Sequence, residues 1–314
     1  MKINTRFLLF LALLLTFASC KKDKTIGFDI GKNRFTTVVD GDDREYYVHV
    51  PGSYDPDVPI PVVFMLHGTS GDGLKFYNIS GWKELGETEN ILTIFPSSWR
   101  YCIIEDGNTQ NITKWNCFPG AFSFCSGETP RDDVKFLRQI LTDLGEKFTL
   151  DDGQVYMVGF SNGGQMATRC SVEMSDVIAA VVESAGSFSN DTLVNPLNKI
   201  PVWYEIGNVD DRLLTDSTTN IPMRDFELFM NVSAYGSKVV SANINSFGCD
   251  SNYVLTGDSN VALLATYPGL TATPPHEFRF MLIKGLEHEY PNGTNHPFNG
   301  PVEHWAWFQQ YRVH

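Results

Sequence analysis

The amino-acid sequence predicts an α/β protein built on one mostly parallel β-sheet with helices on both faces. Short apolar runs recur along the chain without polar-apolar alternation, which is typical of strands buried on both faces of a parallel sheet. Helix-like stretches separate several of these runs, as the crossovers between parallel strands require. The runs are residues 62–66, 91–95, 155–160, 178–182, 202–206 and 278–283.

The other elements follow from local patterns. Two β-rich segments, 35–40 and 45–50, flank a turn-forming sequence and predict an antiparallel hairpin. With the six parallel strands this makes an eight-stranded sheet. Residues 134–148 place their apolar side chains on one helical stripe, and further helices are expected at 165–174 and 223–235.

Residues 97–130 form an insertion rich in aromatic residues and cysteines, without strand-like alternation. Two interpretations stay open: a disulfide-pinned wall or lid over a binding site, or a packed surface excursion. As a wall, the insertion would place Trp115 and Phe118 against a substrate. Tyr290, in a later loop, is the third aromatic candidate for substrate contact.

The first residues predict export. Lys2 and Arg6 precede an almost entirely apolar run, 7–17, which is too short to span a bilayer of ~30 Å. Residues 1–19 therefore read as a signal peptide, and the small residues before Cys20 resemble a bacterial lipobox with an acylated cysteine. An ordinary secretory signal is the alternative. We expect a lipid-attached tether over 20–34, a catalytic domain over 35–314, and a membrane link only through the lipid.

Charge and cysteine content exclude several functions. The chain carries a net charge of −13, which opposes binding to nucleic acid. No CxxC motif or zinc-like spacing occurs, so neither a metal nor another cofactor is expected. Five cysteines besides Cys20 leave at least one thiol unpaired. One or two structural disulfides within residues 102–125 or to Cys249 are favoured, and the exact pairing cannot be deduced. They are Cys102, Cys117, Cys125, Cys170 and Cys249.

The strongest chemical signal is a G-x-S-x-G motif centred on Ser161. It begins at the end of the apolar run 155–160 and opens a helix-like stretch, which is the context of a nucleophile elbow. A sharp strand-to-helix turn strains the serine backbone, and Cβ atoms at the flanking glycines would collide with the neighbouring chain. The alternative is a glycine-rich turn with an incidental serine.

A serine nucleophile needs a histidine base oriented by a carboxylate, and in this arrangement both follow the serine in sequence. His288 lies just past the last apolar run, whereas His276 precedes that run and belongs at the opposite sheet edge. His288 is therefore the expected base. The acid should follow 202–206. Asp210 is favoured there, with Asp211 and Asp216 open as substitutes.

Two backbone N–H groups must stabilise the oxyanion. Asn162, next after the nucleophile, supplies one, and Thr69 is nominated for the other, with Gly68 as second choice. His67 lies upstream of the serine and is expected to be a structural hydrogen-bonding residue.

With these residues in place, the chain resembles bacterial secreted esterases of the α/β-hydrolase fold, related to polyhydroxybutyrate depolymerases and to feruloyl and acetylxylan esterases. The resemblance rests on five segments in order, and the G-x-x-D pattern within 206–210 favours Asp210 as the acid. Tyr290 stands where tryptophan is common, and Asn162 where alanine often follows the serine. The segments are 61–68, 132–144, 155–164, 206–210 and 285–291.

The resemblance implies hydrolysis of a carboxylic ester by Ser161, His288 and Asp210. Feruloyl or acetyl esters of plant polysaccharides are the preferred substrates, because an exported, tethered esterase suits extracellular glycan degradation. Polyhydroxybutyrate-type oligomers are the alternative substrate. A glycan-binding lipoprotein on an inactive hydrolase scaffold is the alternative from another class.

Overall fold

The computed structural model describes residues 27–188, 194–214, 220–271 and 275–313. The expected signal peptide, Cys20 and Asp216 lie outside these ranges. Among the described residues, no helix combines the length and apolar character needed to cross a membrane.

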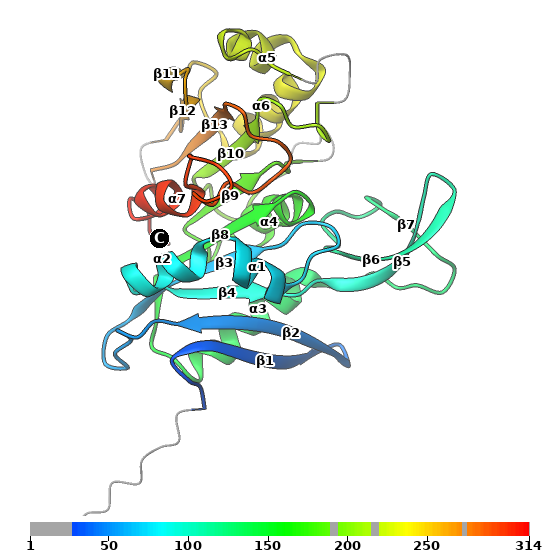
Figure 1. Ribbon diagram of the computed structural model, residues 1–314, viewed down its shortest axis with the longest axis vertical. Helices are drawn as coiled ribbons and strands as arrows, with labels where there is room; N and C mark the ends of the chain where they lie inside the picture. Colours follow the sequence, from blue (N-terminus) through cyan, green and yellow to red (C-terminus); the bar gives the residue numbers. More distant parts are fainter. Residues whose placement is uncertain (1–26, 189–193, 215–219, 272–274, 314) are drawn as a thin grey trace, which may run out of the picture.

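A ten-stranded sheet runs through the molecule in the order β1-β2-β4-β3-β8-β9-β10-β13-β12-β11 (Figure 1). All six predicted buried strands are present, and they form its parallel centre. The predicted hairpin is also present and pairs with β4 in antiparallel fashion. The central strands are β3 (Ile60–Leu66), β4 (Leu92–Pro96), β8 (Leu150–Phe160), β9 (Ala180–Ser184), β10 (Val202–Gly207) and β13 (Glu277–Ile283), and the hairpin is β1 (Gly31–Val39) and β2 (Asp42–Val50).

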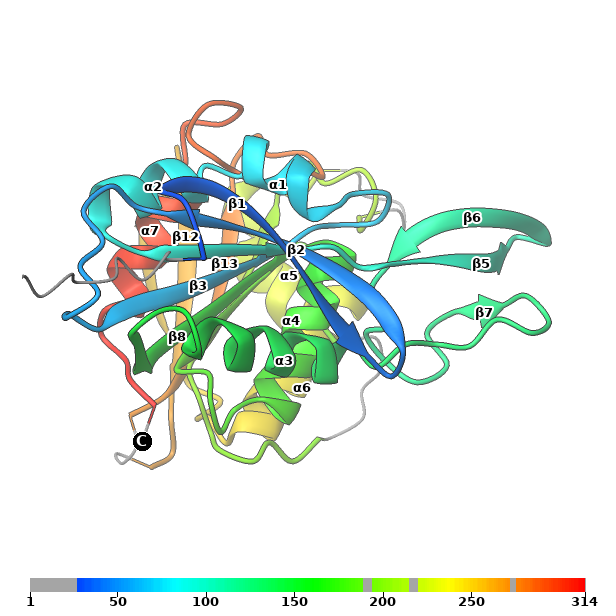
Figure 2. The same cartoon turned by 90° about the horizontal axis from the view of Figure 1, so that it is seen from below.

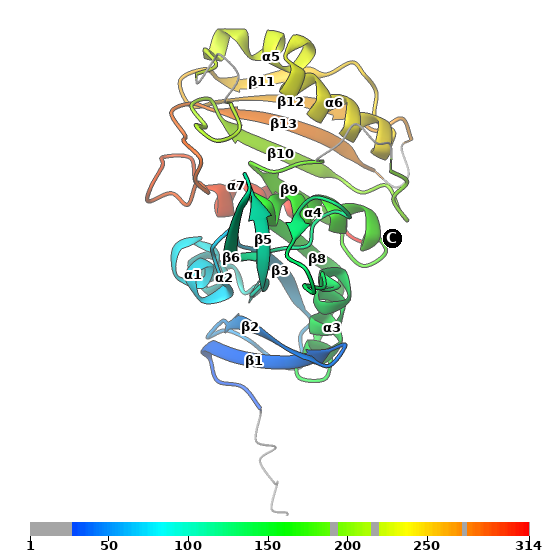
Figure 3. The same cartoon turned by 90° about the vertical axis from the view of Figure 1, so that its right-hand side faces the viewer.

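The α/β fold is as expected, but the sheet has ten strands and not eight. Strands β12 (Ala262–Pro268) and β11 (Val254–Asp258) extend it beyond β13 in antiparallel fashion (Figure 3). Every residue of β11 is exposed, so this edge strand lacks the apolar run that reveals a buried strand. At the other edge, β1 begins at Gly31, inside the segment expected to be a tether.

Helices cover both faces of the sheet (Figure 2). Buried side chains of α3, α4, α5 and α6 pack on one face, and those of α1, α2 and α7 on the other. A short 3-10 turn and a break at Ser233 divide the single helix predicted over 223–235. The helices are α1 (Gly73–Ile79), α2 (Trp82–Glu89), α3 (Asp133–Gly145), α4 (Asn162–Glu173), α5 (Phe226–Val232), α6 (Ala234–Phe247) and α7 (Gly300–Phe308).

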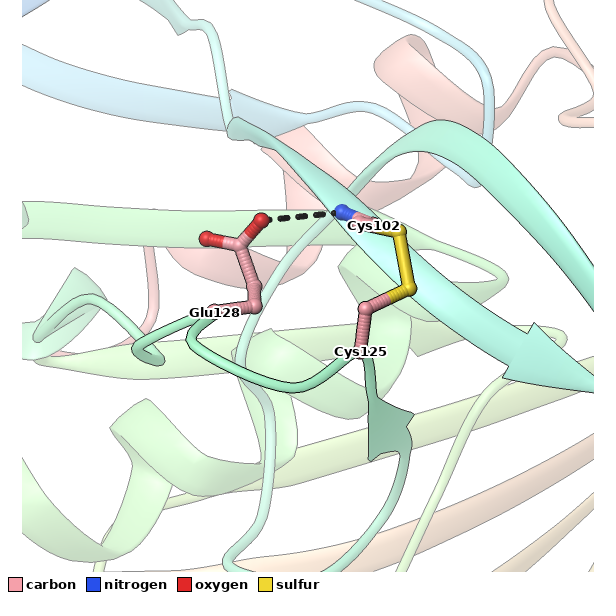
Figure 4. The surroundings of a disulfide bond; sticks show 3 residues. All are labelled: Cys102, Cys125 and Glu128. Carbon is pink, nitrogen blue, oxygen red and sulfur yellow. Dashed lines mark hydrogen bonds between the residues drawn. A yellow bond between two sulfur atoms is a disulfide. The ribbon is translucent and has the colours of Figure 1, made fainter.

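The aromatic insertion is a small antiparallel sheet, which the sequence did not predict. Strands β5 (Trp99–Glu105), β6 (Asn108–Lys114) and β7 (Ser123–Phe124) form an arm that projects from the main body (Figure 2). A disulfide joins Cys102 to Cys125, and Glu128 accepts a hydrogen bond from the Cys102 N–H at 3.0 Å (Figure 4). The three other described cysteines are buried free thiols.

Candidate active site

Ser161 lies at the turn between β8 and α4 in a strained backbone conformation. Its φ of 55° and ψ of −120° fall outside the regions that a non-glycine residue ordinarily adopts. Two backbone hydrogen bonds stabilise this strained conformation. The Ser161 N–H donates to the Ser184 carbonyl at 2.8 Å, and the Ser161 carbonyl accepts from the Gln165 N–H at 3.0 Å. This is the elbow that the motif predicts.

The two glycines of the motif are required by close backbone approach. A Cβ atom on Gly159 would lie 2.0 Å from the Gly163 carbonyl oxygen. A Cβ atom on Gly163 would lie 2.4 Å from the Leu66 carbonyl oxygen. Both distances are far inside van der Waals contact, so the helix can start this close to the sheet only with glycine at these positions.

The structure brings Ser161, His288 and Asp210 together from three loops. The His288 Nε2 atom lies 2.9 Å from the Ser161 hydroxyl oxygen, and the His288 Nδ1 atom lies 2.8 Å from Asp210 Oδ2. The carboxylate can only accept, so it selects the tautomer with the proton on Nδ1. The lone pair of Nε2 then faces the serine hydroxyl, which is the arrangement of a general base.

Asp210 is fixed in place by its own turn. Its Oδ1 atom accepts from the backbone N–H groups of Arg212 at 3.0 Å and Leu213 at 2.9 Å, and its side chain is fully buried. Both carboxylate oxygens are therefore occupied, one by the turn and one by His288. The alternative acid Asp211 is exposed.

The acid and histidine loops are clamped to each other. The Asn208 N–H donates to the Ile283 carbonyl at 2.8 Å, and Asn208 Oδ1 accepts from the Gly285 N–H at 2.6 Å. A Cβ atom on Gly207 would lie 1.8 Å from the Leu286 carbonyl oxygen. The glycine of the G-x-x-D pattern thus lets the two loops touch.

Thr69 and Asn162 are the residues expected to supply the oxyanion donors. Both line the same cavity as Ser161, and within the described residues neither backbone N–H has a hydrogen-bond partner. The Asn162 N–H also lies at the N-terminus of α4, where the helix dipole favours negative charge. These two N–H groups remain the candidates for the oxyanion donors.

His67 is structural, as expected. Its Nδ1 atom lies 2.7 Å from the Gly68 carbonyl oxygen, and its Nε2 atom accepts from the Ser98 N–H at 2.9 Å. Complete burial lowers the pKa of His67 to about 4, so the ring stays neutral and shapes the loop that carries Thr69.

Asn162 has a second role that the sequence did not reveal. Its side-chain Oδ1 accepts from the Trp115 N–H at 2.7 Å, and its Nδ2 donates to the Trp115 carbonyl at 3.3 Å. The indole N–H of Trp115 donates to the His67 carbonyl at 2.9 Å. The arm is thereby fastened to both the elbow and the Thr69 loop.

Two cavities meet at Ser161. The larger, of about 680 Å³, includes His288, Phe160 and Tyr290 in its walls. The smaller, of about 360 Å³, includes Asn162, Phe122, Phe188 and Tyr235. Lys114 lines both cavities, so the arm does contribute a wall to the cleft.

The expected aromatic contacts are only partly met. Trp115 is fully buried behind the cleft, where its hydrogen bonds hold the arm, so it does not face a substrate. Phe118 lies outside both cavity walls, and its ring packs 6.3 Å from that of Phe188. The aromatic residues that do line the smaller cavity are Phe122, Phe188 and Tyr235, and no sequence motif marks them as substrate-binding residues.

Tyr290 lines the larger cavity, but its hydroxyl belongs to a buried network. The Trp82 indole N–H donates to it at 2.8 Å, and it lies 3.2 Å from His304 Nδ1. His304 Nε2 in turn lies 2.9 Å from Glu205 Oε2. This network anchors the loop that carries His288, and the sequence held no signal for it.

Comparisons with known proteins show what the chain is similar to. No family model matches the chain. A putative esterase from Nocardia uniformis subsp. tsuyamanensis is 28% identical over 189 residues, covering 59% of this chain and 50% of that protein. Poly(3-hydroxyalkanoate) depolymerase C of Paucimonas lemoignei is 27% identical over 146 residues, covering 45% of this chain and 31% of the enzyme. Feruloyl esterase B of Piromyces equi is 25% identical over 173 residues, covering 54% and 29%.

The chain thus spans half or less of the length of these relatives. Among solved structures, an acetyl xylan esterase from Aspergillus awamori superposes with a TM-score of 0.57 at 14% identity, covering 88% of this chain and 99% of that one. A feruloyl esterase module from Clostridium thermocellum gives 0.51 at 12% identity, covering 90% and 88%. The chain therefore has the α/β-hydrolase fold, and it is related to proteins named as esterases, feruloyl and acetylxylan esterases, and a polyhydroxyalkanoate depolymerase.

Proposed function

We propose that the chain is an exported serine hydrolase of carboxylic esters. The observation that carries this proposal is the hydrogen-bonded triad of Asp210, His288 and Ser161. His288 lies at hydrogen-bonding distance from both of the other side chains. A serine hydroxyl that is hydrogen-bonded to such a histidine base is activated for attack on a carbonyl carbon. The esterase names of the relatives favour an ester as the carbonyl compound.

In the proposed reaction, His288 Nε2 takes the proton of Ser161 as the serine oxygen bonds to the ester carbonyl carbon. The N–H groups of Thr69 and Asn162 stabilise the oxyanion. The C–O bond to the alcohol breaks, and the alcohol leaves with the proton from His288. Water then attacks the acyl-enzyme, gives one proton to His288, and the acid departs as Ser161 regains its proton.

Esters of feruloyl or acetyl groups on plant polysaccharides are the proposed substrates. The smaller cavity beside Ser161 includes three aromatic residues in its walls, which suits a phenolic acyl group. Oligomers of hydroxybutyrate are the second candidate, favoured by the relative named as a polyhydroxyalkanoate depolymerase.

Hydrolysis of a chromogenic short-chain ester by the wild type and by Ser161→Ala tests the activity. We expect turnover to fall by at least about a thousandfold in the variant. Ser241→Ala, an exposed serine on α6, is the matched control and should keep full activity. Glycan binding without any turnover would instead support the inactive-scaffold function.

A panel of methyl ferulate, acetylated xylan and hydroxybutyrate oligomers then identifies the ester class. The highest kcat/KM on one of the first two supports the polysaccharide assignment. A clear preference for the oligomers would replace it with the polyester assignment.

The lipid anchor is proposed from the sequence around Cys20. Cells that express the full chain should incorporate labelled palmitate into it, and Cys20→Ala should abolish the labelling. Unchanged labelling of that variant would refute acylation at this cysteine.

A further inference from the structure

Among the charged side chains that line the cleft beside Ser161, basic residues outnumber acidic ones, although the chain as a whole is acidic. The net charge of the chain is −13. Yet the walls of the two cavities contain four basic side chains against two acidic ones, Glu105 and Glu289. A cleft whose charge opposes that of the whole chain attracts anions locally. The basic residues are Lys75, Lys114, Arg212 and Lys238.

Two of these cations are available to a ligand. Lys114 is buried, lies 3.5 Å from Glu105 and packs over the ring of Phe122. Lys75 and Arg212 are exposed, and neither makes an ion pair within the part of the chain that the structure describes. Both line the larger cavity.

The positions of Lys75 and Arg212 are set by the catalytic framework. Lys75 lies in the first turn of α1, where its N–H donates to the N-cap Asp72 at 2.7 Å. The Arg212 N–H donates to Asp210, so this residue belongs to the turn that holds the acid. The two cations therefore line the larger cavity from fixed backbone positions, Lys75 in α1 and Arg212 in the turn after Asp210.

The position of His288 determines which part of a bound ester lies beside Lys75 and Arg212. His288 lines the larger cavity together with Ser161, and it is absent from the walls of the smaller one. In the proposed function, on which this step rests, His288 gives its proton to the departing alcohol oxygen. The alcohol must then lie on the His288 side, in the larger cavity, and the acyl group on the side of the smaller cavity.

We propose that the alcohol part of the preferred ester carries a carboxylate, which Lys75 and Arg212 bind. The Arg212 guanidinium can donate two parallel hydrogen bonds to a carboxylate, and Lys75 adds a second positive charge. Two alcohols have this chemistry: a uronate residue of an acidic glycan, and the free carboxylate end of a hydroxyacid oligomer.

The test compares esters that share an acyl group and differ only in the charge of the alcohol. One pair is acetylated galacturonic acid and acetylated galactose; the other is the hydroxybutyrate dimer and its methyl ester. The ratio of kcat/KM, charged over neutral, is measured for each pair. We expect a ratio above one for at least one pair, and a fall of about threefold to tenfold in Lys75→Gln or Arg212→Gln.

Matched controls remove the same charge elsewhere. Lys135→Gln, on α3, and Arg224→Gln, in the 3-10 turn before α5, remove cations outside both cavity walls and should leave the ratio unchanged. Raising the salt concentration to 1 M should reduce the wild-type ratio, because exposed charges are screened.

The outcomes separate this inference from the proposed function. A preference in the sugar pair supports a uronate, and one in the dimer pair supports an oligomer end. Turnover of neutral esters with no charge preference, or an equal fall of the ratio in the control variants, would overturn the carboxylate site and leave the esterase function intact. No turnover of any ester, in wild type as in Ser161→Ala, would overturn both.

Discussion

Replacing Tyr290 with phenylalanine removes one oxygen atom from the buried network beneath the His288 loop. The direction of the hydrogen bonds in this network follows from its members. The Trp82 indole can only donate, so the Tyr290 oxygen accepts from it and the Tyr290 hydroxyl donates to His304 Nδ1. His304 then carries its proton on Nε2 and donates to Glu205.

The substitution leaves two polar groups without partners. Both the Trp82 and the His304 side chains are fully buried, so water cannot replace the lost hydroxyl. An unpaired buried donor or acceptor costs about 1–3 kcal/mol, and two of them give an expected loss of about 3 kcal/mol in the free energy of unfolding. With an unfolding entropy of about 2.1 cal/mol/K per residue over about 280 residues, the melting temperature should fall by about 5 °C.

Thermal and urea unfolding of the purified variant measure this loss. Tyr267→Phe is the matched control, because Tyr267 is equally buried and its hydroxyl donates only to the Met230 sulfur at 3.8 Å. The control should lose less than about 1 kcal/mol. Equal losses in the two variants would refute the network as the anchor of the histidine loop.

Three further substitutions test the elbow and its surroundings. Asn162→Ala should reduce stability by about 1–3 kcal/mol in urea unfolding, because it leaves the buried Trp115 N–H unpaired; an unchanged midpoint would contradict this role. Gly159→Ala should prevent soluble expression, whereas Gly145→Ala, with open space around it, should express normally; a folded Gly159 variant would show that the elbow relaxes. Glu183 is fully buried, and this burial raises the pKa of its carboxyl group to about 8. The folded state therefore binds the Glu183 proton more tightly than the unfolded state. The contribution of this proton to the free energy of unfolding is fully present below the pKa of Glu183 in the unfolded chain and is lost as the pH rises through about 8. Urea midpoints between pH 5 and 9 should fall more steeply for the wild type than for Glu183→Gln, and parallel curves would exclude Glu183 as the cause.

Local patterns were enough to predict the centre of the sheet and the elbow. A strand buried on both faces is a continuous apolar run wherever it lies, so all six parallel strands were recognisable. The elbow was predictable because backbone strain at Ser161 demands glycine at fixed neighbouring positions. The sequence predicts His288 as the base because chain order and strand ends restrict which histidine can reach the serine side of the sheet.

Edge strands and long-range partners escaped prediction for a common reason. Strand β11 is exposed along its whole length, so its pairing with β12 leaves no hydrophobic pattern. The joining of Cys102 to Cys125 depends on how the arm folds, and cysteine spacing alone allowed several pairings.

From the sequence, apolar periodicity predicts the fold class, glycine sterics and chain order predict Ser161 and His288 as catalytic residues, and the G-x-x-D pattern of the family resemblance predicts Asp210. The folded chain was needed to show that Trp115 holds the arm, that the Tyr290 hydroxyl reaches His304, and that Lys75 and Arg212 line one cavity. Each of these contacts joins residues far apart in the chain. The direction of a side chain across such a distance is set by packing, which no local pattern encodes.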